Sequence, residues 1–291
     1  MPRVSILMAT YNRAGLIGKT IQSLLAQTFK DWELIVPDDG SKDNTPEVMR
    51  EWQKKLPQIT YIRNEVNQGI SKNYNSGFKV AKGEYIAMID DDDPWCDPKK
   101  LEKQVKFLDE NKDYVGCGGG MIVVSPVRDR EGSQRGFVSN GVDLKHQELY
   151  RYFKPETDEQ IRSKMLFGNP IANSTTIFRR SAGEKVSWYD ESIRYSGDRD
   201  FWLKLGVIGK LYNFPEYFSY YTMSGSNTSI VKMRPHLKTS LEVMMRYKKN
   251  YPHYFSALIF NWIQYLYSFL PNFIKKAAHY SLARLKRLVV G

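Results

Sequence analysis

Short apolar runs and stretches with helical periodicity alternate along the first hundred residues of the chain. The apolar runs fall at residues 4–9, 32–36 and 84–89, with a shorter one at 59–63. Between them, apolar residues recur at helical spacing over residues 16–25. Helices are also predicted over residues 45–56 and 71–81. Strands that alternate with helices predict βαβ crossovers, so we expect a mostly parallel sheet with helices on both faces.

This pattern weakens in the second half of the chain. Residues 128–140 are polar and contain glycine, which predicts a loop. Residues 171–179 and 211–221 are expected to be strands, and 201–205 a helix. The glycine-rich run at 116–120 lacks the residue order of a phosphate-binding loop, so it indicates close backbone packing within a strand.

Three of the predicted strands end in polar clusters. In chain order, the clusters are Thr10-Tyr11-Asn12, Asp38-Asp39 and Asp90-Asp91-Asp92-Asp93. Ligands of open α/β sheets bind at the carboxyl ends of the strands, which meet at one edge of the sheet. We therefore expect the three clusters to form a single site.

The four consecutive aspartates are the strongest single signal in the sequence. Packing like charges together costs stability unless a cation offsets them. Carboxylate oxygens at a strand end suit Mg²⁺ or Mn²⁺, which keep open positions for phosphate oxygens. The alternative is a solvated acidic turn, which the apolar strand leading into the cluster disfavours.

A second acidic segment comes directly before an apolar helix and reads Ser196-Gly197-Asp198-Arg199-Asp200. An aspartate in this position is commonly an N-cap. Asp198 can instead act as a general base that takes a proton from an acceptor hydroxyl. The four histidines are scattered singly, and no H-E-x-x-H or serine-elbow motif supports hydrolysis.

Taken in order, these motifs resemble those of glycosyltransferase family 2, a large inverting family with the GT-A fold. The resemblance covers roughly residues 3–222. The opening V-S-I-L-M-A-T-Y-N-R is similar to the first strand of the family, and residues 37–45 are similar to its D-D-G-S-x-D-x-T motif. The resemblance implies that Ala9, Thr10 and Tyr11 flank the nucleotide base and that Asp39 binds uracil.

Three further segments extend the resemblance. Residues 67–77 are similar to N-x-G-x-S-x-A-R-N-x-G, with Tyr74 where the family has arginine and Lys72 as its candidate substitute. Residues 90–93 resemble D-x-D-D, which implies Asp90 near the ribose and Asp92 on the metal, and a register one residue away stays open. Gly197-Asp198 stands where the family commonly has Glu-Asp. The residues implied are Ala9, Thr10, Tyr11, Arg13, Asp39, Gly69, Lys72, Asn75, Asp90 and Asp91 for the nucleotide sugar, Asp92 for the metal and Asp198 as the base.

The resemblance implies an inverting glycosyltransferase. Asp198 would deprotonate an acceptor hydroxyl, whose oxygen displaces the diphosphate, and Mn²⁺ or Mg²⁺ would stabilise that leaving group. We expect a UDP-sugar as donor and a growing, lipid-linked surface glycan as acceptor. Two other functions stay open: a non-catalytic nucleotide-sugar binding module, and a sugar-phosphate nucleotidyltransferase, whose glycine-rich N-terminal loop is missing here.

The formal charge of +11 raises the question of nucleic acid binding. Residues 232–291 carry eleven lysines or arginines and one acid, Glu242, so residues 1–231 are almost neutral. A basic tail on a neutral body indicates an attachment device rather than a nucleic-acid interface. We therefore expect no nucleic acid partner.

The tail contains two different segments. Residues 254–270 are uncharged but shorter and more polar than the ~20 apolar residues of a spanning helix. Residues 274–289 place apolar side chains on one helical face and basic ones on the other, which is typical of a helix lying on anionic lipid. The alternatives are helices packed on the catalytic body or on a second subunit, and a transmembrane hairpin.

These patterns predict the organisation of the chain. Residues 1–225 are expected to form a GT-A catalytic domain, with a nucleotide-binding half at 1–118 and an acceptor-binding half at 119–225, followed by a helical appendage at 232–291. Two cysteines without metal-ligand spacing and the lack of a signal-peptide cleavage site predict a reducing compartment. We expect a cytoplasmic enzyme, peripheral on the inner face of the cell membrane.

Overall fold

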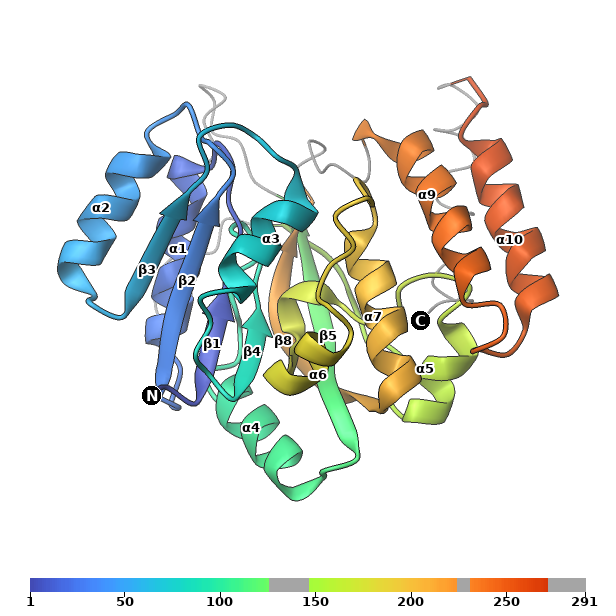
Figure 1. Cartoon of the computed structure of the whole chain (residues 1–291), viewed down its shortest axis with the longest axis horizontal. Helices are drawn as coiled ribbons and strands as arrows, with labels where there is room; N and C mark the ends of the chain where they lie inside the picture. The colour runs from blue at the N-terminus through green and yellow to red at the C-terminus, as the bar shows by residue number, and fades with distance from the viewer. Residues whose placement is uncertain (126–146, 224–230, 272–291) are drawn as a thin grey trace.

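The computed structural model describes residues 1–125, 147–223 and 231–271. In these residues one eight-stranded sheet runs through the molecule, and helices cover both of its faces (Figure 1). The strand order is β3-β2-β1-β4-β7-β5-β6, and β8 pairs with β5. This arrangement confirms the predicted α/β architecture with a C-terminal helical part.

Strands and helices alternate strictly up to β5 and less regularly after it. The strands are β1 (Val4–Leu7), β2 (Trp32–Asp38), β3 (Ile59–Arg63), β4 (Tyr85–Met88), β5 (Tyr114–Ser125), β6 (Gln147–Tyr152), β7 (Ile177–Arg179) and β8 (Lys210–Thr222). The helices are α1 (Ala14–Leu25), α2 (Thr45–Lys55), α3 (Ile70–Phe78), α4 (Lys100–Glu110), α5 (Asp158–Lys164), α6 (Arg180–Lys185), α7 (Gly197–Ile208), α9 (Met233–Arg246) and α10 (Tyr254–Tyr267).

The first four strands pair in parallel, as the alternation of strands and helices predicts. β2 lies between β3 and β1, and β1 pairs with β4 so that Leu7 lies opposite Met88. The predicted strands at 4–9, 32–36 and 84–89 correspond to β1, β2 and β4. β7 is antiparallel to both β4 and β5, so the second half of the sheet is mixed.

Alternate residues of β1 enter two separate cores. Val4 and Ile6 are fully buried on one face, in the core that contains apolar residues of α1, α2 and α4. Leu7 is fully buried on the opposite face, in the core that contains residues of α3, α7 and α9. A strand buried on both faces has no polar face, which explains why its sequence is apolar apart from Ser5, whose hydroxyl donates to Glu33 of β2 at 2.7 Å.

The glycine-rich run at 116–120 lies in β5. A Cβ on Gly119 would come within 2.5 Å of the Phe218 ring, and one on Gly120 within 2.6 Å of the Phe153 ring. Phe218 belongs to β8, the strand that pairs with β5. The absence of side chains thus lets neighbouring aromatic rings lie directly on the β5 backbone, and the predicted close packing is confirmed.

Residues 171–179 form a strand only in part. β7 covers Ile177–Arg179, and the preceding Asn173–Thr175 form a 3-10 turn. The Thr175 hydroxyl donates to the Ala172 carbonyl at 2.7 Å, and the Thr176 hydroxyl donates to the Asn173 carbonyl at 2.7 Å. Such local side-chain bonds compete with strand pairing, so the predicted strand is too long. The predicted loop at 128–140 lies outside the described residues.

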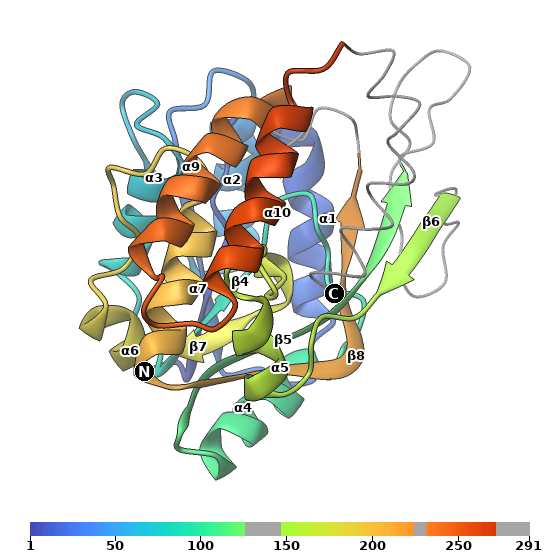
Figure 2. The same cartoon turned by 90° about the vertical axis from the view of Figure 1, so that its right-hand side faces the viewer.

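Helices α9 and α10 form a hairpin that packs on the α/β body beside α7 (Figures 1 and 2). Val243 and Met244 of α9 and Ala257 of α10 are fully buried in the same core as Trp202 of α7. Of the alternatives for the tail, helices packed on the catalytic body therefore describe α9 and α10. The amphipathic segment at 274–289 lies outside the described residues.

Within residues 1–125, 147–223 and 231–271, no helix combines the length and the apolar character needed to cross a bilayer.

Candidate functional site

The carboxyl ends of β2, β1 and β4 lie side by side. The Thr10 N–H donates to the Pro37 carbonyl at 2.9 Å, and the Asp39 N–H donates to the Thr10 carbonyl at 3.0 Å. On the other side of β1, the Ile89 N–H donates to the Leu7 carbonyl at 3.1 Å. The three predicted polar clusters are thus brought together at one edge of the sheet.

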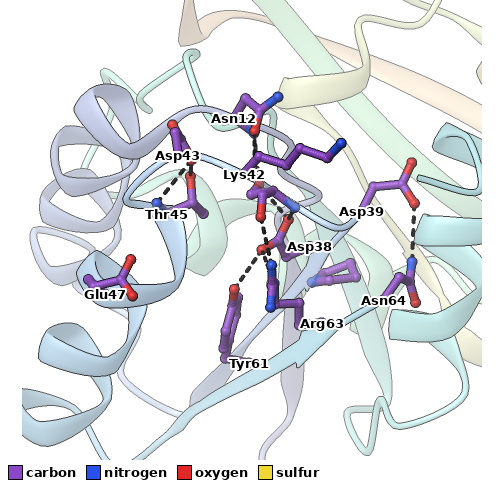
Figure 3. A network of polar contacts seen from close by, with 12 residues as sticks. Asn12, Asp38, Asp39, Lys42, Asp43, Thr45, Glu47, Tyr61, Arg63 and Asn64 are labelled. Atoms are coloured by element: carbon purple, nitrogen blue, oxygen red, sulfur yellow. Dashed lines mark hydrogen bonds and ion pairs between the residues drawn. The ribbon is translucent and has the colours of Figure 1, made fainter. Parts of the chain in front are cut away.

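Asp38 and Asp39 point into different surroundings (Figure 3). Asp38 is fully buried and accepts hydrogen bonds from the Ser41 hydroxyl at 2.5 Å and the Tyr61 hydroxyl at 2.6 Å. The Arg63 guanidinium lies 3.8 Å from the same carboxylate. These contacts fix the turn that follows β2, so Asp38 has a structural role.

Asp39 holds the loop that leads into α3. Its carboxylate accepts the backbone N–H groups of Gln68 at 2.8 Å and Gly69 at 2.9 Å, and the Asn64 side-chain amide at 3.2 Å. Gly69 has a φ of +93°, and no heavy atom lies within 4 Å of the position that a Cβ would occupy. Glycine is therefore required here by the backbone conformation and not by a lack of space for a side chain.

The four aspartates after β4 separate into two pairs. In the first pair, Asp91 accepts the Thr10 hydroxyl at 2.7 Å, and Asp93 accepts the Ser174 hydroxyl at 2.9 Å and the Thr222 N–H at 3.1 Å. Both carboxylates are buried. They tie the acidic turn to the ends of β1 and β8 and form its framework.

Asp90 and Asp92 form the second pair. Oδ1 of Asp90 accepts the Tyr74 hydroxyl at 2.9 Å and the Asn173 side-chain amide at 3.3 Å. Asp92 forms an ion pair with Arg13 at 3.1 Å. Repulsion from Asp92 is a cause, after burial, of the raised pKa of Asp90, so the two carboxylates lie close to each other.

Burial raises the pKa of all four carboxyls. Repulsion from Asp92 adds to this effect at the other three, and the pKa of Asp91 rises to about 8. The Arg13 cation acts in the opposite direction on the pKa of Asp92. A second positive charge beside Asp90 and Asp92 would offset the cost of burying the two charged carboxylates and would reduce their mutual repulsion.

A divalent cation fits this site only together with other ligands. Among the described residues, no group of three or more Asp, Glu, His or Cys side chains could hold a metal ion. Asp90 and Asp92 supply two carboxylates, and Mg²⁺ is commonly held by one or two carboxylates plus substrate phosphates and water. The donor set therefore fits Mg²⁺ or Mn²⁺ shared with a diphosphate.

Tyr74 occupies the place of the family arginine and contacts Asp90 directly. Its ring stacks on Tyr189, with 5.3 Å between the ring centroids. Burial, and then the charge of Asp90, raise the pKa of Tyr74, so its hydroxyl stays a neutral donor. A neutral donor leaves the charge of Asp90 uncompensated, so a cation beside Asp90 would be stabilised.

The other predicted donor-binding residues differ in their surroundings. Ala9 is buried at the end of β1, Tyr11 is 40% exposed, and Lys72 is exposed on α3. The Asn75 side-chain amide donates to the Tyr189 carbonyl at 3.0 Å and accepts the N–H of the same residue at 3.2 Å. Asn75 thus holds α3 to the segment before α7, and its direct contact with a nucleotide stays a prediction.

Asp198 lies in the first turn of α7. The N-cap of this helix is Ser196, so the N-cap interpretation of Asp198 does not hold. The Asp198 carboxylate accepts the Asn169 side-chain amide at 2.9 Å, and its charge contributes to the raised pKa of Asp90. The structure therefore brings Asp198 close to the aspartates of the β4 edge, where the helix dipole also favours a carboxylate.

Gly197 has a steric reason to be glycine. A Cβ at this position would lie 2.7 Å from the Ser71 Oγ and 3.1 Å from the Tyr189 ring. The Ser71 hydroxyl donates to the Ile193 carbonyl at 2.9 Å, which holds it in place. The start of α7 therefore packs directly on α3, and any residue other than glycine at position 197 would require the Ser71 hydroxyl to move.

Sequence reasoning missed four residues of this site: Asn169, Asn173, Ser174 and Tyr189. The Asn173 Oδ1 and the Tyr189 hydroxyl are buried without a hydrogen-bond partner among the described residues. Burial of Tyr189, followed by the charges of Asp198 and Asp90, raises its pKa, so it is a neutral donor between the two acids. No motif marks these residues, which come from a turn and a loop.

Comparison with known sequences gives consistent matches. The family model described as glycosyl transferase family 2 matches residues 5–187. An uncharacterized glycosyltransferase of Methanocaldococcus jannaschii is 30% identical over 290 residues, which cover 94% of this chain and 92% of that protein. Another, from Haemophilus influenzae, is 28% identical over 88% of this chain and 76% of that protein. Chondroitin synthase of Escherichia coli is 29% identical over 80% of this chain but 31% of its own length.

Solved structures share the fold. TarS of S. aureus in complex with UDP-GlcNAc superposes with a TM-score of 0.63 at 20% identity, covering 92% of this chain and 73% of that chain. The mannosyltransferase PcManGT of Pyrobaculum calidifontis, in complex with GDP-Man and Mn²⁺, gives a TM-score of 0.62 at 18% identity, covering 97% of this chain and 80% of that chain. At these identities the similarity concerns the architecture.

Proposed function

The chain belongs to glycosyl transferase family 2 and is a glycosyltransferase, and we propose that it transfers a sugar from a UDP-sugar to a hydroxyl group of a surface glycan with inversion at the anomeric carbon. The UDP-GlcNAc bound to TarS supports a uridine donor. The GDP-Man bound to PcManGT shows that a similar architecture accommodates guanine, so the choice of base needs a direct test.

In this proposal each acidic residue of the site has a separate task. The loop between Asp39 and α3 receives the base, and Asp90 orients the ribose. Asp92 and Asp90 hold Mn²⁺ or Mg²⁺, which would supply positive charge to the diphosphate leaving group. Arg13 adds a second cation at the same edge, since it already lies 3.1 Å from Asp92. Asp198 takes the proton of the acceptor hydroxyl as its oxygen attacks the anomeric carbon.

The observation that carries the proposal is the closeness of Asp198 to Asp90. Asp198 lies in the first turn of α7 and Asp90 follows β4, yet the charge of Asp198 contributes to the raised pKa of Asp90. Direct displacement needs a base for the acceptor hydroxyl and a separate site that stabilises the leaving group. In this proposal Asp198 is the base, and Asp90 belongs to the leaving-group site.

The base assignment is tested with Asp198→Asn, which keeps the side-chain shape but cannot accept the proton. We expect turnover, measured as UDP release from a panel of UDP-sugars with Mn²⁺, to fall by ~10²–10⁴-fold. The affinity for UDP with Mn²⁺, measured by calorimetry, should stay unchanged. Asp113→Asn, an exposed acid paired with Lys210 far from the site, is the control. Unchanged turnover, or lost UDP affinity, in Asp198→Asn would refute the assignment.

We further propose that the enzyme works on an anionic membrane surface, where a lipid-linked acceptor is available. α10 supports this, because large apolar side chains are exposed along its outer side. Their exposed fractions are Phe255 78%, Ile259 63%, Trp262 47%, Ile263 53% and Leu266 60%. Residues 232–271 also carry six lysines or arginines against Glu242. This charge would repel a second copy of the hairpin and attract anionic lipid.

Vesicle sedimentation tests the membrane proposal. The full chain should bind phosphatidylglycerol vesicles, and the double variant Ile259→Ser, Leu266→Ser should bind them clearly less because it loses buried apolar area. Val207→Ser changes an apolar, 44% exposed residue of α7, outside the hairpin, and serves as the control. Equal binding of all three proteins would remove α10 as the lipid surface, and a dimer that the double variant dissociates would identify a second copy as its partner.

A further inference from the structure

Arg199 follows the proposed base directly and is a buried cation. Its side chain is 4% exposed, and burial lowers its pKa to about 10. The guanidinium donates to the Leu166 carbonyl at 2.7 Å, to the Ser240 hydroxyl and to Asn261 Oδ1 at 3.3 Å. None of these acceptors in the described chain is a carboxylate. A buried charge held by neutral groups is costly, so a fold that retains one has a use for its geometry.

The acceptors of Arg199 come from two places. Ser240 lies in α9 and Asn261 in α10, so one side chain reaches both helices of the hairpin. Leu166 lies in the segment after α5, and its carbonyl also accepts the Asn261 side-chain amide at 2.9 Å. That segment continues to Asn169, the hydrogen-bond partner of Asp198. Asp198 is supported by the first turn of α7, in which it lies, and by the segment of Leu166 and Asn169. Arg199 and Asn261 thus connect the hairpin to both of these elements.

Two other residues of the same turn also contact the hairpin. The Ser196 hydroxyl lies 3.1 Å from the Nδ1 of His236 in α9. Asp200 is fully buried and accepts the Tyr247 hydroxyl, from the end of α9, at 2.9 Å. Ser196, Arg199 and Asp200 surround Asp198 in sequence, and each is held from the hairpin. The side chain of Asp198 itself is held by Asn169 instead.

We infer that Arg199 is a positioning residue, through which the α9–α10 hairpin sets the place of the base at the start of α7. The inference rests on the proposed role of Asp198. A carboxylate that removes a proton during attack must lie within hydrogen-bond reach of the acceptor hydroxyl, and a displacement of about 1 Å can cost ~10²-fold in rate. The hairpin is therefore part of the catalytic apparatus without contacting substrate.

Two tyrosines offer a matched test of this inference. Tyr247 donates to Asp200 in the first turn of α7 at 2.9 Å, whereas Tyr251 donates to the Leu203 carbonyl, further along the same helix, at 2.7 Å. Tyr247→Phe and Tyr251→Phe each remove one hydroxyl between the hairpin region and α7. Both should lower the melting temperature by a few degrees. We expect only Tyr247→Phe to lower the turnover number for UDP release, by ~10-fold.

Arg199→Met should have a larger effect, ~10²-fold on turnover, with the affinity for UDP and Mn²⁺ unchanged. If this variant does not fold, Ser240→Ala removes one acceptor of Arg199 and should lower turnover in the same way by a smaller factor. Unchanged turnover in Arg199→Met and Ser240→Ala, or a parallel loss of UDP affinity, would overturn the role of Arg199, and equal turnover in Tyr247→Phe and Tyr251→Phe would overturn the wider role of the hairpin. Asp198→Asn tests the base assignment separately. If this variant keeps full turnover, the base assignment is wrong; if it loses turnover while Arg199→Met and Ser240→Ala do not, the positioning role is wrong.

Discussion

The donor edge, by which we mean the ends of β1, β2 and β4 with their proposed donor-binding side chains, and the α9–α10 hairpin contribute to the same proposed site in different ways. At the donor edge, the proposed functional side chains stand in recognisable motifs, and neighbouring loops hold them. At α7, the proposed base stands in a short, weakly marked motif, and its position depends on Arg199 and on helices that come later in the chain. The first region shows its chemistry in its sequence, and the second shows it only once the chain is folded.

The difference concerns what each region contributes. The donor edge contributes charged side chains, and only a few residue types carry a charge. The hairpin contributes the correct placement of the proposed base, which many combinations of hydrogen bonds and apolar contacts can supply. A motif therefore identifies the first contribution, and only the packing identifies the second.

The largest expected effect comes from removing the hairpin with a chain that ends at residue 230. Val243, Met244 and Ala257 are fully buried in the core shared with α7. Burying a large apolar side chain contributes about 1.5–3 kcal/mol, and a domain has about 5–15 kcal/mol in total. We expect no cooperative thermal transition by circular dichroism. A shortened chain that melts cooperatively and still releases UDP would make the hairpin a separable appendage.

A smaller effect distinguishes the two pairs of aspartates at the donor edge. Asp93→Ala leaves the Ser174 hydroxyl and the Thr222 N–H without their acceptor, at a cost of about 1–3 kcal/mol for each group. Its melting temperature should fall clearly. Asp92→Ala removes a charge that repels its neighbours, so its melting temperature should change little while turnover and the Mn²⁺ response are lost. Calorimetry with and without Mn²⁺ and UDP measures both, and the reverse pattern would exchange the two roles.

The smallest effect is a dependence of stability on pH. The folded state raises the pKa of Asp91 to about 8, and the unfolded chain has an aspartate pKa of about 3.9. The folded protein therefore holds the proton more tightly, and its stability falls as pH rises between these values. Without divalent cations, the melting temperature should fall by a few degrees from pH 5 to pH 6.5.

Asp91→Asn provides the control for this dependence, because it removes one titrating group and should reduce the slope. Lys100 does not interfere in that range. Burial lowers its pKa to about 7, so the stability that its deprotonation adds appears only at higher pH. A melting temperature that rises from pH 5 to pH 6.5 would contradict the raised carboxyl pKa values.

Much of the fold follows from periodicity, because β1, β2 and β4 are buried on both faces and therefore read as nearly continuous apolar runs, interrupted by Ser5 and Glu33, which bind each other. The part around 171–179 does not follow, since the hydroxyls of Thr175 and Thr176 turn an apparent strand into a 3-10 turn. That turn supplies Asn173, whose amide binds Asp90. Residues whose role depends on a local turn carry no periodic signal.

The hairpin was predicted as an appendage for a related reason. Its sequence shows charge and aromatic residues, which describe the surface of α9 and α10. The contacts that join it to the body combine a few buried apolar side chains, such as Val243 and Met244, with single polar side chains. Ser240 and Asn261 bind Arg199 across long sequence separations. No spacing rule links three such residues, so the sequence indicates a helical tail without indicating where it packs.

The close approach of Gly197 to Ser71 limits what the residue before the proposed base can be in this chain. A Cβ at position 197 would lie 2.7 Å from the Ser71 Oγ. Any residue other than glycine would therefore require the Ser71 hydroxyl, which donates to the Ile193 carbonyl at 2.9 Å, to move. The α3–α7 contact is thus built around a glycine in this protein, and a search that demands Glu-Asp before this helix would overlook enzymes built in this way.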